Sequence, residues 1–257
     1  MVDGSRKTRA KGSRSSRSPE FDAVLFDLFG TLIPTGPQPA RVQNLKEMAR
    51  ILKVDPDGFA KSWMESFDPR ARGEFGPLER TIERLATLHG GHPRRAEVLR
   101  AARVRLGFAR QLLASSGRVL SALDALRAAG VRLALVSDTS DETTRLWPET
   151  DLSQRFEVTV FSCEEGVRKP NPRIYETALR RLALPASRCA FVGDGGSNEL
   201  TGARAVGLTP FLYRFPDEEA SSAYRVDAEV GWTGPELSDL TELLPPPAGR
   251  AAPRVNR

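Results

Sequence analysis

The sequence predicts an α/β protein in which a parallel sheet is covered by helices and one helical insertion interrupts the chain. Short apolar runs of strand length, such as AVLF, end in polar residues. From Val119 onward such runs alternate with helical patterns, which is typical of a parallel sheet. Between Arg41 and about Ser115 the apolar residues instead recur at helical spacing, and no strand-like run occurs.

The first strand is predicted near the start of the segment FDAVLFDLFGTL. Its apolar run ends at Asp27, and Gly30 and Thr31 follow at once, which indicates a buried strand opening into a tight turn. Residues 34–39 hold three prolines and one glycine, so they form a linker into the insertion.

The insertion, predicted as residues 35–115, is expected to be entirely helical. Three apolar stripes indicate its helices: Val42, Leu45, Ala49 and Leu52; Leu78, Ile82, Leu85 and Leu88; and Val98, Ala102, Leu106 and Leu113. Its polar residues His89, His92, Arg94 and Arg95 are candidates for substrate contact, although an arginine on such a helix is usually solvated.

The remaining elements belong to a core predicted as residues 21–34 and 116–244. A helical stripe beginning at Val119 is closed by Gly130. Strands are predicted at 131–137, 156–161, 189–194 and 209–215, a helix from Pro172 with Asn171 as its N-cap, and another from Ser197 to Ala205.

Composition excludes several classes of protein. The net charge is +5, but residues 1–20 hold six basic and two acidic residues, so the body is close to neutral and no nucleic-acid partner is expected. The apolar fraction of 40% and the absence of a run of roughly 18 apolar residues argue against a membrane protein. Residues 1–20 and 245–257 are predicted to be disordered tails.

Both cysteines, Cys163 and Cys189, lie beside apolar runs, where a small buried thiol is common. We therefore expect a reduced, cytoplasmic protein. We also expect a small-molecule substrate and a monomer or homodimer.

Four polar residues lie at or just beyond the predicted strand ends. These are Asp27, Ser137, Lys169 and Asp194. Because ligands of open α/β sheets bind at the carboxyl ends of strands, these four side chains are the first candidates for a site.

In this order, the stretches FDLFGTL, LALVSD, GVRKPNPRIY and FVGDGGSNELTGA resemble the haloacid dehalogenase-like hydrolase superfamily, in the subgroup with a helical C1-type cap. The resemblance covers about residues 21–215. It implies a doubly wound, Rossmann-like core that carries an aspartate nucleophile, and an inserted α-helical cap that contacts the substrate.

The resemblance implies phosphoryl transfer, in which catalysis is largely positioning and neutralisation of charge on the phosphoryl oxygens. Asp27 would attack phosphorus and form an aspartyl-phosphate. Mg²⁺ would be held by the carboxylates of Asp27 and Asp194 and by the main-chain carbonyl of Phe29. Lys169 would offset the negative charge of nucleophile and phosphate.

Further contacts are expected from neighbouring residues. Ser137 and the main-chain N–H groups of Gly30 and Thr31 would donate hydrogen bonds to the phosphoryl oxygens. Glu199 would hold the waters of the metal. Asp138 and Asn198 lie close by, where helix capping explains them equally well.

One departure leaves the reaction open. Most phosphatases of the superfamily have a general acid two residues after the nucleophile, where this chain has Phe29. Such an acid is typically worth about 10² to 10⁴ in rate. The chain is therefore expected to be a magnesium-dependent phosphatase of a small phosphorylated metabolite, a 2-haloacid dehalogenase-type hydrolase, or a non-catalytic relative. Asp194 favours the first, since beside Asp27 it would repel a carboxylate substrate unless a cation lay between them.

Overall fold

We describe the fold from a computed structural model, which covers residues 20–215, 229 and 231–244. The two predicted tails, 1–20 and 245–257, lie outside these residues apart from Glu20. Nothing in the described structure therefore bears on the prediction that they are disordered.

Five parallel strands form one sheet in the order β3-β2-β1-β4-β5. The strands are β1 (Ala23–Phe26), β2 (Arg132–Ser137), β3 (Val158–Phe161), β4 (Cys189–Gly193) and β5 (Thr209–Leu212). The chain starts at the centre, fills one side of the sheet and then crosses to the other, which is the doubly wound arrangement. The predicted fold class is confirmed, and each strand lies within its predicted segment.

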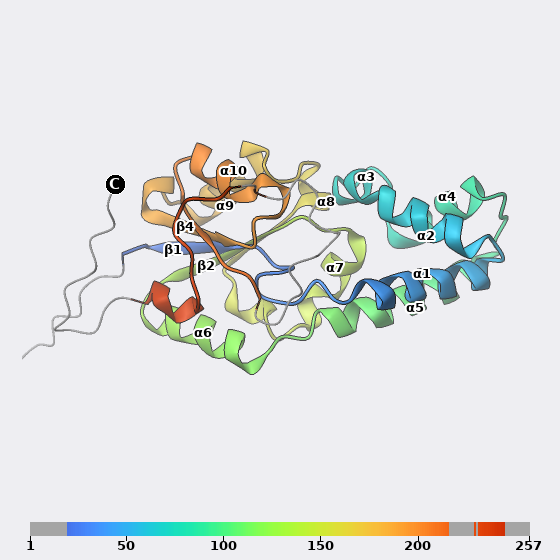
Figure 1. Ribbon diagram of the computed structural model, residues 1–257, viewed down its shortest axis with the longest axis horizontal. Helices are drawn as coiled ribbons and strands as arrows, with labels where there is room; N and C mark the ends of the chain where they lie inside the picture. Colours follow the sequence, from blue (N-terminus) through green and yellow to red (C-terminus); the bar gives the residue numbers. More distant parts are fainter. Residues whose placement is uncertain (1–19, 216–228, 230, 245–257) are drawn as a thin grey trace, which may run out of the picture.

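Helices cover both faces of the sheet (Figure 1). The core helices are α6 (Gly117–Ala128), α7 (Asp141–Leu146), α8 (Ser162–Glu165), α9 (Pro172–Leu182) and α10 (Glu199–Ala205), with short 3₁₀ turns η1 (Trp147–Glu149), η2 (Ser153–Arg155), η3 (Ala186–Arg188), η4 (Gly196–Asn198) and η5 (Leu240–Leu243). In β1, Val24 and Phe26 join the apolar cluster under α6, and Ala23 and Leu25 join the cluster under α9 and α10. This alternation follows from the two-residue period of a strand.

The start of α9 agrees with its prediction, and the start of α10 does not. The side chain of Asn171 caps α9 by accepting a hydrogen bond from the N–H of Arg173 at 3.0 Å. The helix predicted from Ser197 begins at Glu199 instead. Ser197 and Asn198 have φ values of 56° and 50°, so both adopt left-handed conformations that an α-helix excludes.

The insertion forms a separate bundle of five helices beyond one end of the sheet (Figure 1). They are α1 (Gln38–Leu52), α2 (Pro56–Glu65), α3 (Phe67–Ala71), α4 (Leu78–Leu88) and α5 (Arg95–Leu112). The three predicted stripes fall on α1, α4 and α5 and supply much of the bundle's own apolar core, whereas α2 and α3 were not predicted. Leu88, the last residue of α4, belongs to the second stripe, but its side chain is 69% exposed. We call this bundle the cap and the sheet with its helices the core.

Neither cysteine is paired: Cys163 is half-buried and Cys189 is buried. Among the described residues, no helix combines the length and the hydropathy that crossing a membrane requires.

The cap approaches the core closely just after α3. Gly73 has φ of +71°, and a Cβ built on it would lie 2.2 Å from the carbonyl oxygen of Cys163 in α8. We expect Gly73→Ala to lower the free energy of unfolding by about 2–5 kcal/mol, because left-handed strain and a backbone clash add together. Urea unfolding would measure the change.

Gly90→Ala is the matched control. Gly90 also has φ of +71°, but nothing lies within 4 Å of its added Cβ. Only the conformational cost of about 1–2 kcal/mol should then remain. Equal losses in the two variants would mean that the cap does not hold this distance from the core in solution.

Candidate active site

The sheet brings the predicted strand-end residues to one edge. Asp27 directly follows β1, Asp194 directly follows β4, and β1 and β4 are neighbours. Lys169 arrives from the loop before α9, and Glu199 is the first residue of α10. These four side chains, far apart in the sequence, meet where the winding of the sheet reverses.

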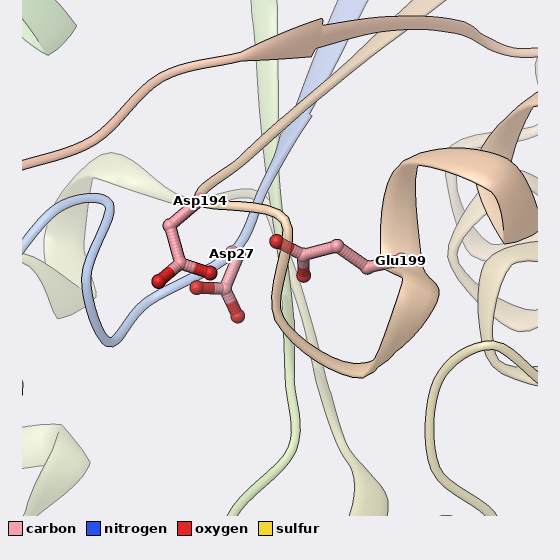
Figure 2. Close-up of side chains that lie close together, drawn as sticks. All are labelled: Asp27, Asp194 and Glu199. Carbon is pink, nitrogen blue, oxygen red and sulfur yellow. The ribbon is translucent and has the colours of Figure 1, made fainter. Parts of the chain in front are cut away.

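Asp27, Asp194 and Glu199 form a buried group of carboxylates, which we call the acid cluster (Figure 2). One oxygen from each lies within 4.8 Å of the others. All three residues are at most 5% exposed. Figure 2 shows the carboxylates of Asp27 and Asp194 side by side and that of Glu199 directed towards them from α10.

Lys169 is the cation within this cluster. Its Nζ donates to a carboxylate oxygen of Asp27 and, at 2.5 Å, to Oε2 of Glu199. Burial alone would lower the pKa of Lys169, but the charges of Asp27 and Glu199 outweigh it and hold that pKa well above its usual value. Lys169 is therefore a permanent ammonium group here.

One ammonium does not balance three carboxylates. Burial raises the pKa of Asp27 to about 6, in spite of Lys169 and with a further contribution from the nearby charge of Asp194. Burial likewise raises the pKa of Glu199 well above its usual range. When all four groups are ionised they carry two net negative charges, and a divalent cation would offset that excess.

The loop after β4 is shaped to hold the acid cluster. Gly195, at φ of +87°, donates its N–H to Oε1 of Glu199 at 3.0 Å, and Gly196 donates its N–H to Oδ1 of Asp194 at 2.9 Å. A Cβ on Gly193 would lie 2.2 Å from Oε1 of Glu199. The glycines of the segment GDGG therefore give Glu199 the space and the donor that fix its carboxylate.

The turn after β1 positions the nucleophile candidate. The hydroxyl of Thr31 donates to Oδ2 of Asp27 at 3.2 Å. The N–H groups of Gly30 and Thr31 donate within the turn, to the carbonyls of Ile33 at 2.7 Å and Leu28 at 3.4 Å. The phosphoryl contacts assigned to those two N–H groups, and the metal contact assigned to the carbonyl of Phe29, stay predictions.

Ser137 is completely buried at the end of β2. Its Oγ has no hydrogen-bond partner within the described residues. Leaving a buried hydroxyl unsatisfied costs about 1–3 kcal/mol, so a ligand that accepted its hydrogen bond would recover that energy. Its predicted contact with a phosphoryl oxygen remains a prediction.

A cavity of about 410 Å³ lies over the acid cluster, between cap and core. The cap contributes apolar side chains, including Leu45 and Leu112, and the aromatic Trp63. Phe29, two residues after Asp27, lies in the wall where most phosphatases of the superfamily have a general acid. The cap residues His89, His92, Arg94 and Arg95 do not line the cavity.

The cavity also contains charged side chains that the sequence analysis missed: Arg70, Arg105 and Glu142. Arg70 and Arg105 lie on cap helices with no neighbouring motif, and Glu142 lies four residues beyond the stretch LALVSD, so no motif residue pointed to them directly. Arg168 does not line the cavity, but it ties the core loop before Lys169 to the cap through Asp68 at 3.0 Å, and it also pairs with Asp138 at 3.3 Å.

Comparison with known proteins agrees with this geometry. The family model described as haloacid dehalogenase-like hydrolase matches residues 21–207. A ribulose-1,5-bisphosphate 5-phosphatase from Halopiger xanaduensis is 27% identical over 239 residues, covering 86% of this chain and 98% of that protein. A phosphoglycolate phosphatase from Nitrosospira multiformis is 27% identical over 231 residues, covering 86% and 95%.

A solved structure, a 2-haloacid dehalogenase from Pseudomonas syringae pv. Tomato DC3000, superposes with a TM-score of 0.63. It is 23% identical, and the match covers 86% of this chain and 95% of that one. At this identity the likeness concerns the fold alone.

The ion pairs of Lys169 yield a stability prediction. Lys169→Met would leave the acid cluster without its buried cation, and we expect the free energy of unfolding to fall by about 3–5 kcal/mol. Urea unfolding in EDTA is the measurement, so that no added metal compensates the loss.

Lys53→Met is the control, because Lys53 pairs with Glu97 at 2.8 Å through a side chain that is 71% exposed. Its loss should cost less than about 1 kcal/mol. A Lys169→Met loss as small as the control's would contradict the assigned pairing.

Proposed function

The chain belongs to the haloacid dehalogenase-like hydrolase family, and we propose that it is a magnesium-dependent phosphatase of a small phosphorylated metabolite, with Asp27 as nucleophile. The observation that carries the proposal is the acid cluster with Lys169 at the floor of the cavity. Two similar proteins of nearly full coverage are phosphatases by name, which supports the same class of reaction.

The donor set fits a hard divalent cation. Asp27, Asp194 and the carbonyl of Phe29 would hold Mg²⁺, which when bound supplies positive charge to the phosphoryl oxygens. Both oxygens of Glu199 are already engaged, one with Lys169 and one with the N–H of Gly195. That engagement supports a role for Glu199 towards the waters of the metal.

In the proposed reaction a carboxylate oxygen of Asp27 attacks phosphorus in line, and the bond from phosphorus to the ester oxygen breaks. Water then hydrolyses the aspartyl-phosphate and releases phosphate. Thr31 holds one oxygen of Asp27 and Lys169 the other, so the carboxylate has a fixed direction before substrate arrives. The hydroxyl of Ser137 would donate to a phosphoryl oxygen.

Phe29 has no proton to donate to the leaving oxygen. Glu142 does not supply that proton, because Arg105 and Arg70 overcome its burial and hold its pKa at about 2. Among the described cap residues, Glu65 is the carboxylate that lines the cavity. If Glu65 does not protonate the leaving oxygen, the site is best equipped to cleave esters with good leaving groups.

Introducing the acid tests this point. Phe29→Asp should raise kcat for an alkyl ester such as glycerol 3-phosphate, relative to p-nitrophenyl phosphate, by about 10- to 100-fold, the low end of what general acids supply. Phosphate release gives both rates.

Phe29→Asn is the matched control, since it has the same shape as the aspartate without the proton. A rise in both variants would mean that the gain does not come from proton donation, and a rise in neither would mean that another group already protonates the leaving oxygen.

The second candidate function is dehalogenation, and Phe29 is the observation that favours it. A halide leaves without protonation, so an aromatic residue at that position costs such a reaction nothing. Against it stands the acid cluster, whose excess negative charge would repel a carboxylate substrate.

A paired assay distinguishes the two reactions. The purified protein would be given p-nitrophenyl phosphate and, separately, 2-chloropropionate, each with Mg²⁺ and with EDTA. We expect phosphate release that is lost in EDTA, because the excess negative charge of the acid cluster needs a divalent cation. Chloride release that persists in EDTA would instead assign the dehalogenase reaction.

Asp27→Asn serves as the control for that assay. The amide is a poor nucleophile, so the variant should lose at least about 10³-fold in kcat. Wild-type turnover in this variant would refute the assignment of Asp27. Silence of the wild type in both assays would favour the non-catalytic relative.

We also propose a cytoplasmic location, supported by the two unpaired thiols. The expectation of a monomer or homodimer stays a prediction.

A further inference from the structure

Two arginines of the cap face one glutamate of the core in the wall of the cavity. From this arrangement we infer that Arg70 and Arg105 bind a second anionic group, a carboxylate or a second phosphate, on the part of the substrate that is not cleaved. The inference rests on the proposed function, since it names the class of phosphate ester that the acid cluster would receive.

The three side chains form a buried network that joins cap to core. Arg105 of α5 donates from Nε at 3.0 Å and from Nη2 at 2.8 Å to Oε1 of Glu142 in α7. Arg70 of α3 lies 3.9 Å from the same oxygen. The side chains are 13%, 6% and 4% exposed for Arg105, Arg70 and Glu142, so water screens their charges weakly.

The network carries one net positive charge, because two guanidinium groups share one carboxylate. Arg168 shows the contrast: it also bridges cap and core, but it contacts two carboxylates, those of Asp68 and Asp138. A buried unbalanced cation is costly unless it is paired, and an anionic ligand would pair it.

Donors also remain for such a ligand. A guanidinium has five N–H groups. Arg70 uses three, towards the hydroxyl of Ser66 at 3.3 Å, the hydroxyl of Ser140 at 3.0 Å and the carbonyl of Trp63 at 2.9 Å, which leaves two. Arg105 uses two, both towards Glu142, which leaves three without a hydrogen bond to any described residue.

Trp63 holds the two arginines close together. Its ring lies 4.8 Å from the guanidinium carbon of Arg70 and 5.4 Å from that of Arg105. The pKa of Arg70 is lowered to about 10, chiefly by burial. The positive charge of Arg105 contributes to this lowering, and the negative charge of Glu142 opposes it. An anion between the two guanidinium groups would relieve this repulsion.

The rest of the wall suits the carbon skeleton that joins two anionic ends. Leu45, Ala109, Leu112 and Leu113 are apolar and line the same cavity as Asp27 and Arg105. A volume of about 410 Å³ accommodates a small metabolite and not a polymer.

Matched substrate pairs test the inference. Phosphate release would be compared for 3-phosphoglycerate against glycerol 3-phosphate, and for ribulose 1,5-bisphosphate against ribulose 5-phosphate. We expect the wild type to favour the anionic member of at least one pair by about 10- to 100-fold in kcat/KM, as charge-assisted hydrogen bonds allow. The first pair reports a carboxylate and the second a phosphate.

Arg105→Gln should bring that ratio close to one, since the network then carries no net charge. Glu142 keeps Arg70 as a partner in this variant, which favours folding. Arg105→Lys retains the charge with fewer donors and should keep part of the preference, which provides a second readout if the glutamine variant does not fold. Arg103→Gln is the matched control on α5, because Arg103 is exposed, and it should keep both the rates and the ratio.

The outcomes separate the two proposals. If the wild type releases p-nitrophenol from p-nitrophenyl phosphate but shows no preference within either pair, the inference is overturned and the proposed function stands. An equal fall for both members of a pair in Arg105→Gln would also overturn it. If no ester is hydrolysed at all, the proposed function fails first.

Discussion

The ion pairs of Lys169 with Asp27 and Glu199 are the interaction on which the rest of this molecule depends. They connect the loop before α9 with the end of β1 and the start of α10, so they join three separate parts of the chain at the edge of the sheet. The parallel strands bring these parts together, and the glycines at the end of β4 and just after it leave room for the side chain of Glu199. What remains uncompensated is negative charge at the floor of the cavity, which is the chemical basis of the proposed metal.

Local patterns were sufficient to predict the core. The three central strands are short apolar runs whose two faces are both buried, so these runs are visible without knowledge of their partners. Asp27 and Asp194 could be predicted for the same reason, because in a parallel sheet the strand ends lie on one edge. Lys169 lies beyond α8 rather than at the end of β3, so the stretch GVRKPNPRIY pointed to it and its position along the sheet did not.

The cavity wall could not be predicted in this way. Helical spacing shows which face of α5 is apolar, but not that Arg105 at its margin meets Arg70 from α3 and Glu142 from α7. Leu88 is exposed because it continues the apolar stripe of α4 beyond the last turn that packs inside the cap. Likewise α10 begins at Glu199 and not at Ser197, because the tertiary contacts of Glu199 hold the preceding loop in left-handed conformations. The local sequence does not reveal such contacts.

Arg168 and Lys169 are adjacent in the chain, yet one contacts Asp68 of the cap and the other contacts Asp27. A two-residue segment therefore joins the cap to the ammonium group that pairs with Asp27. Any displacement of the cap from the core would have to lengthen or break the contact between Arg168 and Asp68, one peptide bond away from Lys169. The distance between cap and core and the pairing of Asp27 therefore depend on the same short segment.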